Sequence, residues 1–227
     1  MKFAINAGIN TLPTCDNLKR WGKRSNERCP FCGNIQTLAH VLSNCSSALD
    51  QGRFTWRHDS IIRTFISAVD SRLKDGCVLF SDLDGYQAPH GGTIPPDILV
   101  TNFRPDFVIL NRNSRRIALL ELTCPWDSNV TNAHRYKEEK YASLVADLAR
   151  DYKVFHYSVK ISVRGQVSKE NRSRLKSLAY EFCHESKLVT RSLINYGSKA
   201  ALLGSFSLFS ARNEPSWASP RHIIVNS

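Results

Sequence analysis

Three cysteines and one histidine lie close together in the first part of the chain, where Cys29 and Cys32 are followed by His40 and Cys45. Zinc binds four thiolate or imidazole ligands in a tetrahedron, and a Cys-x-x-Cys turn places two thiolates on one side of such a site. Gly33 suits the tight turn that follows the second cysteine. We therefore expect a structural zinc ion here, because four protein ligands leave no coordination position open for a substrate. The alternative is a set of buried free cysteines beside an unrelated histidine.

Two acidic residues stand at the ends of short apolar runs. Asp106 precedes the run 107–110, and Glu121 follows the run 117–120. If residues 113–114 form the turn of a hairpin, Asp106 lies directly opposite Glu121, with about 4.5–5.5 Å between the two Cβ atoms. Two carboxylates held that close repel each other, and a bound Mg²⁺ ion is the usual reason to tolerate this. The alternative is a pair of strand-end charges in solvent that pair with nearby arginines.

Two lysines and a further acid extend this candidate site. A helix is predicted over about 132–150, and its apolar stripe places Lys137 at a buried position, with Lys140 near the same side. A lysine near two acids can position or deprotonate the attacking water, or hold a phosphate. By its place on the stripe, Lys137 is preferred, although a lysine that extends past Tyr141 into solvent is as common. Asp59 is predicted either to bind the metal or water, or to cap the start of an earlier helix.

Hydrophobic patterns predict the scaffold that positions these residues, and they indicate a mixed α/β (α+β) fold. Apolar residues at helical spacing over 62–73 predict a helix, the two runs beside the acids predict a hairpin, and residues 153–163 predict a further strand. We expect residues 1–53 to form a basic lead-in and the cysteine/histidine module. Residues 54–165 should form a mixed sheet flanked by helices, and residues 166–227 a helical extension that packs on this core.

The charge of the chain indicates a polyanionic partner. There are 31 lysines and arginines against 20 aspartates and glutamates, which gives a net charge of +11. No run of about 18 apolar residues and no convincing signal peptide are found, so we expect an intracellular protein without a membrane partner. In a reducing compartment, the seven cysteines favour metal over disulfides. Five basic residues that crowd ahead of the first paired cysteine are predicted to bind nucleic acid: Lys19, Arg20, Lys23, Arg24 and Arg28.

Taken in order, the motifs resemble those of site-specific non-LTR retrotransposons, in which a Cys-Cys-His-Cys zinc knuckle precedes a restriction-like, PD-(D/E)xK endonuclease. The resemblance covers roughly residues 1–165. The segments that carry it, besides the knuckle itself, are Thr11-Leu12-Pro13-Thr14, Arg57-His58-Asp59, Arg104-Pro105-Asp106, Glu121-Leu122-Thr123-Cys124-Pro125-Trp126 and Lys137-Glu138-Glu139-Lys140-Tyr141.

The resemblance implies a restriction-endonuclease-like mixed sheet in which Asp106 and Glu121 bind catalytic Mg²⁺ and a lysine assists the water. Thr123 occupies the position where many relatives of the wider class have this lysine. In the retrotransposon group the lysine is displaced onto the following helix, which here offers Lys137 or Lys140.

The same resemblance implies a wider biological setting. The expected reaction is a nick in target DNA whose 3′-hydroxyl primes reverse transcription, in the nucleus, with element RNA as a second partner. The parent polyprotein of this family includes a reverse transcriptase, and no Tyr/Phe-x-Asp-Asp polymerase motif occurs in this sequence. We therefore expect the chain to be the C-terminal part of such a protein.

One position departs from the family and keeps alternatives open. Lys160 stands where an acid is usual. This departure favours the main alternative, a catalytically inactive, zinc-dependent nucleic-acid-binding remnant of such an element. A structure-selective nuclease similar to junction resolvases is a third interpretation. The sequence assigns no chemistry to residues 166–227.

Overall fold

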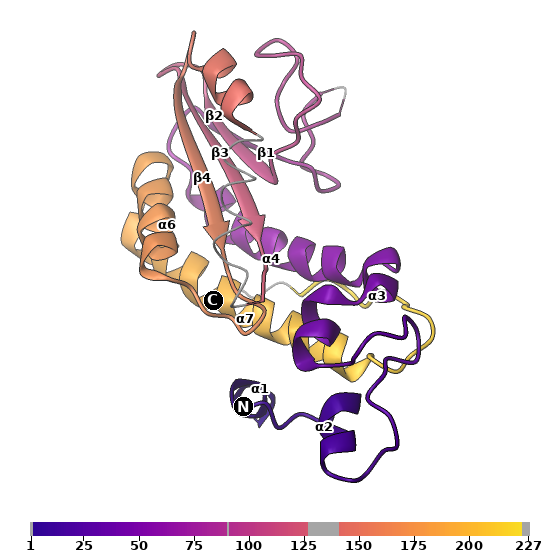
Figure 1. The fold of residues 1–227 in the computed structure, drawn as a ribbon. Helices are drawn as coiled ribbons and strands as arrows, with labels where there is room; N and C mark the ends of the chain where they lie inside the picture. Colours follow the sequence, from indigo (N-terminus) through magenta and orange to yellow (C-terminus); the bar gives the residue numbers. More distant parts are fainter. Residues whose placement is uncertain (1, 90, 127–140, 224–227) are drawn as a thin grey trace.

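A computed structural model describes residues 2–89, 91–126 and 141–223, and it shows a mixed α+β fold with one four-stranded sheet (Figure 1). The strand order is β1-β2-β3-β4. The first three strands are antiparallel neighbours, whereas β4 runs parallel to β3. The strands are β1 (Cys77–Ser81), β2 (Phe107–Asn111), β3 (Arg116–Thr123) and β4 (Lys153–Lys160).

The pairing of β2 with β3 has the register that the hairpin prediction requires. Phe107 pairs with Leu120, and Asn111 pairs with Arg116. One further step along this register brings residue 106 opposite residue 121. The hairpin prediction is therefore confirmed, and the two acids start on the same face because side chains alternate with a period of two.

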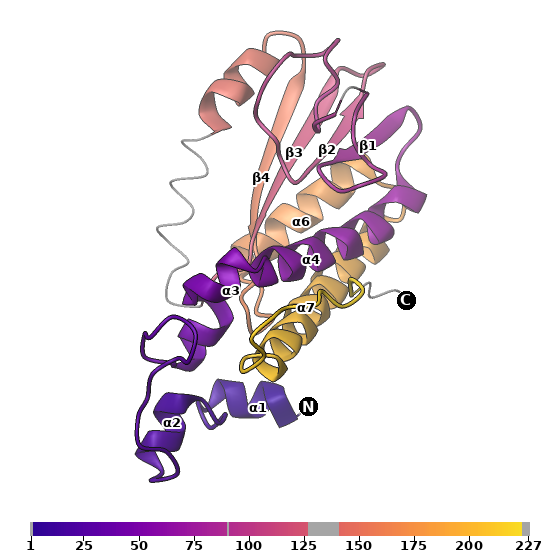
Figure 2. The same ribbon diagram turned by 90° about the vertical axis from the view of Figure 1, so that its right-hand side faces the viewer.

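Three helices cover one face of the sheet: α4 (Arg53–Val69), α6 (Lys169–Phe182) and α7 (Ser186–Ser210) (Figures 1 and 2). The helix predicted from apolar residues 62–73 is α4, which is followed by the 3-10 turn η2 (Asp70–Arg72). Its inward side chains meet those of the strands and of α6 and α7 in one core cluster, which includes Ile62, Phe65, Ile66, Leu120, Leu122, Val159, Leu175 and Leu193.

The opposite face of the sheet is covered by a helix over residues 141–148 and by the segment that joins β1 to β2. Tyr141, Leu144 and Leu148 are buried there against Val108 and Leu119. These residues confirm the later part of the helix predicted over 132–150. Its earlier part, with the candidate lysines at positions 137 and 140, lies outside the described residues.

The N-terminal region is helical and rests against the end of α7 (Figure 2). Phe3 packs on Phe206 and Phe209 of α7, with ring centroids 5.4 and 5.8 Å apart. In the part of the chain that the structure describes, no helix has the length and apolar character needed to cross a membrane. The elements of this region are α1 (Lys2–Gly8), α2 (Cys15–Arg20), the π-helix η1 (His40–Asn44) and α3 (Ser46–Asp50).

Candidate metal centre and acidic site

The cysteine/histidine cluster has the geometry of a metal site. The ligand atoms of Cys29, Cys32, His40 and Cys45 all lie within 4.8 Å of one another. The Cys32 and Cys45 sulfurs are 3.9 Å apart, and the Cys32 sulfur is 3.3 Å from Nε2 of His40. A tetrahedral zinc ion with Zn–S bonds of about 2.3 Å would place its sulfur ligands roughly 3.8 Å apart. The cluster can therefore hold a metal ion such as zinc.

Local backbone structure brings these four side chains together. Gly33 adopts φ +74°, which favours glycine, and its N–H donates to the Cys29 carbonyl to close the turn between the first two ligands. His40 begins the π-helix η1, and Cys45 follows its last residue. These two ligands thus lie at opposite ends of one short helix, and their ligand atoms are within 4.8 Å of each other. The prediction that the histidine and the last cysteine close the site from one short helix is confirmed.

The electrostatics of the cluster suit a bound cation. Burial lowers the pKa of His40, which keeps the imidazole in the neutral form that binds metals. Burial also raises the pKa of the Cys45 thiol to about 11. Without a cation this thiol therefore stays protonated, and metal binding would release its proton.

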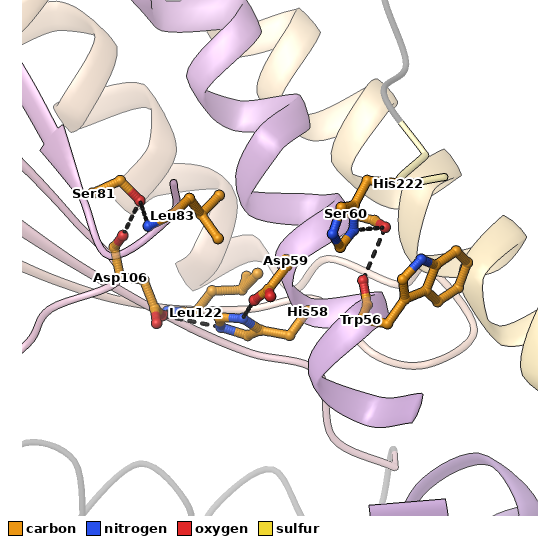
Figure 3. Close-up of polar contacts among 9 residues, drawn as sticks. All are labelled: Trp56, His58, Asp59, Ser60, Ser81, Leu83, Asp106, Leu122 and His222. Carbon is orange, nitrogen blue, oxygen red and sulfur yellow. Dashed lines mark hydrogen bonds and ion pairs between the residues drawn. The ribbon is translucent and has the colours of Figure 1, made fainter. Parts of the chain in front are cut away.

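At the end of the sheet, Asp106 is held by groups from three elements. Its Oδ2 accepts a hydrogen bond from the backbone N–H of Leu122 at 2.5 Å, and its carbonyl accepts one from the Ser81 hydroxyl at 2.7 Å (Figure 3). Nε2 of His58 lies 3.2 Å from the same Oδ2. The carboxylate is 18% exposed, so it is fixed in position and still reaches solvent.

His58 bridges two carboxylates. Its Nδ1 lies 3.0 Å from Oδ1 of Asp59, while its Nε2 contacts Asp106 (Figure 3). Burial opposes protonation of the imidazole, but the charges and hydrogen bonds of Asp106 and Asp59 outweigh it and raise the pKa of His58 to about 10. These three residues, with Asp82 and others, line a pocket of about 250 Å³. The segment Arg57-His58-Asp59 was recognised in the sequence as a motif, but its spacing did not predict the contact between His58 and Asp106.

Asp59 does not cap a helix. Helix α4 begins at Arg53 with Gly52 at its N-cap, so Asp59 lies more than one turn inside the helix. The N-cap interpretation is wrong, because the helix begins earlier than its apolar residues indicated. The predicted metal or water contact of Asp59 stays a prediction, and its carboxylate does line the pocket beside Asp106.

Glu121 is buried, with 3% of its surface exposed. Burial raises the pKa of Tyr141, and a hydrogen bond with Glu121 and the charges of Asp106 and Asp82 raise it further. The Tyr141 hydroxyl also donates to the carbonyl of Arg104 at 3.2 Å. The interpretation of both acids as solvent charges is wrong for Glu121, because the helix over residues 141–148 covers it.

The arginines proposed as partners of the two acids are engaged elsewhere. Arg104 pairs with Asp82, and Arg116 pairs with Glu181. Among the described residues, the cysteine/histidine cluster is the group that gathers three or more potential ligand atoms within 4.8 Å. The acids at the sheet end do not form such a group among these residues.

Two buried hydroxyl groups lie beside Glu121. Thr123 Oγ1 and Ser158 Oγ are buried and have no hydrogen-bond partner among the described residues. Ser158 pairs with Glu121 in the β3–β4 register. A buried polar group without a partner is costly, so a water molecule or ion at this place would relieve it. Because the parallel pairing of β3 with β4 was not predicted, Ser158 was not among the predicted site residues.

Arg57 connects the two regions. It is 2% exposed, and its Nη1 donates to the carbonyl of Leu42 at 2.8 Å, inside the π-helix between two cluster ligands. Its Nη2 lies 3.4 Å from the carbonyl of Cys124, just after β3. A third contact, at 3.2 Å, joins Nη1 to the Ser205 hydroxyl of α7. The same guanidinium therefore braces the metal cluster and the strand that carries Glu121.

The five basic residues predicted to bind nucleic acid are all exposed. Lys19 pairs with Glu27, and Arg20 contacts the side chain of Asn17. Arg28 donates to the carbonyl of Gly33 at 2.9 Å, whereas positions 23 and 24 lie on the turn that follows α2. Their part in nucleic-acid binding stays a prediction.

Comparison with known proteins adds no identification, because the chain matches no protein-family model and no curated protein.

Proposed function

We propose that this chain is a Mg²⁺-dependent DNA endonuclease that nicks its target, as the C-terminal part of a retrotransposon protein. The observation that carries the proposal is the β2–β3 register, which places residue 106 opposite residue 121 at one end of the sheet, where Tyr141 bonds to Glu121. Magnesium binds through one or two carboxylates and keeps waters and substrate phosphates as its other ligands. Asp106 lines a pocket, and Glu121 lies beside two buried hydroxyls that have no partner among the described residues, an arrangement that fits that requirement.

The order of elements also supports the proposal. Helix α4, the three antiparallel strands, the helix over 141–148 and the parallel strand β4 follow one another along the chain. This order, with acids at the start of the second strand and the end of the third, agrees with the restriction-like core that the motifs resemble. The net charge of +11 fits a phosphodiester substrate, whose affinity would fall steeply with salt.

The proposed reaction is hydrolysis of one phosphodiester bond. A water oxygen bonds to phosphorus as the P–O3′ bond breaks, the water proton passes to solvent, and O3′ takes up a proton. The products are a 5′-phosphate and a 3′-hydroxyl. A bound Mg²⁺ ion would activate the water and offset the charge that grows on the phosphate. Asp106 and Glu121 would hold that ion, and Tyr141 would fix the orientation of Glu121.

The cysteine/histidine cluster completes the proposal as a structural zinc site. Its four protein ligands close the tetrahedron, and its sulfurs are packed among Ala48, Phe31 and Phe54. It would hold the basic N-terminal region against the core, in reach of DNA or element RNA.

Incubation of the chain with supercoiled plasmid and Mg²⁺ tests the proposal. We expect open circles whose formation a chelator abolishes, with a 3′-hydroxyl that a polymerase extends. Asp106→Asn and Glu121→Gln should each reduce nicking at least about 1,000-fold. Asp97→Asn is the matched control, because this exposed acid pairs with Arg112 far from the site and its loss should change nothing.

Two outcomes would contradict the proposal. Plasmid that stays closed at every Mg²⁺ concentration, while the chain still binds DNA, would favour the inactive nucleic-acid-binding remnant. Full nicking by the Asp106→Asn variant would show that the hydrolytic site lies elsewhere.

A further inference from the structure

Lys160 is the last residue of β4, on the strand next to the one that carries Glu121. In the parallel register, Thr123 pairs with Lys160, as Glu121 pairs with Ser158. Paired residues of parallel strands share a face of the sheet, and the side chains along each strand alternate. Lys160 therefore belongs to the face of Ser158 and Glu121.

Contacts along β4 confirm this assignment of faces. The ring of His156 lies against that of Tyr141, with centroids 5.8 Å apart, so the even-numbered positions of β4 face the helix over 141–148. Tyr157 and Val159 belong to the opposite core, beneath α4 and α6. Lys160 follows His156 by four residues and so faces the side on which Tyr141 bonds to Glu121.

The distance between Lys160 and Glu121 is within reach of a lysine side chain. Adjacent strands are about 4.8 Å apart and a parallel strand rises about 3.3 Å per residue, so their Cα atoms are separated by roughly 8 Å. The four-carbon stem of a lysine can carry its ammonium group across most of that span. Lys160 can thus contribute a positive charge next to the acids from a neighbouring strand.

Lys160 lines a pocket beside the start of α6. The residue is 5% exposed, yet it lines a pocket of about 200 Å³ together with Pro125, Ser162 and Asn171. Its backbone N–H donates to Oδ1 of Asn171 at 3.1 Å, which fixes the strand end against α6. A charged lysine is rarely buried without an electrostatic purpose.

We propose that Lys160 is a catalytic residue whose ammonium group contacts a phosphate oxygen at the reacting centre, an inference that rests on the proposed nuclease function. The hydroxyl of Thr123, at the paired position on β3, carries no charge that could take this role. During hydrolysis negative charge grows on the phosphate oxygens, and a cation fixed beside them stabilises that charge. Lys137 and Lys140, which the sequence favours, are the competing candidates.

Nicking by lysine variants tests this assignment. Lys160→Met keeps the length of the side chain and removes its charge, and we expect nicking to fall at least about 100-fold. Lys160→Arg should recover part of the loss, which a purely structural effect would not explain. Lys153→Met, at the exposed opposite end of β4, is the matched control and should nick like wild type. DNA affinity measured with Ca²⁺ should change much less than the rate.

Full nicking by Lys160→Met would overturn the proposal. So would a loss of DNA affinity that accounts for the whole loss of nicking. Full activity of Lys160→Met together with inactive Lys137→Met or Lys140→Met would return the role to the helix.

A second measurement keeps this inference separate from the proposed function. An ammonium group near the acids repels a divalent cation, so Lys160→Met should bind Mn²⁺ several-fold more tightly than wild type. Glu121→Gln should bind it more weakly. If wild-type protein fails to nick DNA but shows this pattern, the proposed function is wrong and the position of Lys160 is right. Unchanged Mn²⁺ affinity in Lys160→Met would place the ammonium away from the acids and overturn the inference.

Discussion

The cysteine/histidine cluster and the acidic site are assembled in opposite ways. All four cluster ligands come from residues 29–45, where one tight turn and one short π-helix bring them together. The acidic site combines Asp106 and Glu121 with His58 of α4 and Tyr141 of a later helix. The cluster therefore depends on local backbone geometry and would depend on the ion that it can hold. The acidic site depends on strand register and on the packing of helices against both faces of the sheet.

This difference predicts how each region responds to mutation. Loss of a cluster ligand removes the ion that organises a small region with little core of its own. A change at the acidic site removes one contact from a framework that the large core maintains. Arg57 touches both regions, so its loss should affect both.

The largest effect is expected from Cys45→Ser, which breaks the cluster. A serine hydroxyl is a poor zinc ligand, so stoichiometric zinc should be lost and the free energy of unfolding should fall by at least about 3 kcal/mol. Elemental analysis and urea denaturation followed by circular dichroism measure both quantities. Cys77→Ser is the control, because this cysteine lies on β1 outside the cluster. A Cys45→Ser protein that retains zinc, or unfolds at the wild-type urea concentration, would contradict a structural zinc site.

The cluster could be predicted from sequence because its information is local. The spacing of Cys29, Cys32, His40 and Cys45 contains nearly all of its geometry, and the glycine after Cys32 marks the turn. The structure adds the type of helix. A π-helix rather than an α-helix joins the last two ligands, and residue types alone do not distinguish the two.

The acidic site could be predicted only in part. The hairpin register followed from the short turn and the apolar runs, so the placement of residue 106 opposite residue 121 could be predicted from the sequence. The parallel pairing of β4 and the contact of His58 with Asp106 could not, because residues more than 35 positions apart meet there through tertiary packing. Lys160 was interpreted as a departure from a family pattern because an acid is usual at its position. Its place opposite Thr123 became visible only with the parallel pairing of β3 and β4.

Arg57→Leu should give the second largest effect and tests the connection between the regions. The change leaves the carbonyls of Leu42 and Cys124 and the Ser205 hydroxyl without their buried donor. We expect a loss of about 2–4 kcal/mol in stability, with weaker zinc retention and slower nicking together.

Matched variants identify the cause of this loss. Arg57→Lys should recover little, since an ammonium group cannot reproduce the planar fork. Arg191→Leu, at an exposed position of α7, should be neutral. An Arg57→Leu protein that loses nicking but keeps wild-type zinc affinity would show that the two regions are independent.

A smaller loss of stability, without an effect on the cysteine/histidine cluster, is expected from Gly197→Ala in α7. The added Cβ would lie 2.5 Å from Cε1 of Phe65 and 2.9 Å from Cδ1 of Ile161. Overpacking of this kind costs about 1–3 kcal/mol, and the gain of about 1 kcal/mol in helix propensity offsets part of it. Urea denaturation should show a net loss of about 1 kcal/mol with unchanged zinc content.

Two controls define the origin of that loss. Gly8→Ala in α1 introduces a Cβ that meets no atom within 4 Å and should not destabilise the protein. In the double variant Gly197→Ala, Phe65→Leu, the two losses should be less than additive, because the smaller side chain makes room for the new methyl group. Additive losses would mean that the contact between α7 and α4 is not the cause.

The smallest effect is expected from His58→Gln, measured without added divalent cation as a function of pH. Because the neighbouring carboxylates raise the pKa of His58 from 6.5 to about 10, its protonation favours the folded state. This contribution is complete below pH 6.5 and declines as the pH rises towards 10, where the folded protein also loses the proton. The stability difference between wild type and His58→Gln should therefore be largest near pH 6.5, at about 1 kcal/mol after solvent screening, and should shrink steadily towards pH 10.

His184→Gln, at an exposed histidine, is the control and should show no such trend. The cysteine/histidine cluster is unchanged in both variants and does not contribute to the comparison. A stability difference that stays constant with pH would mean that the imidazole does not bridge Asp106 and Asp59 as a cation. Packing alone would then position these two acids.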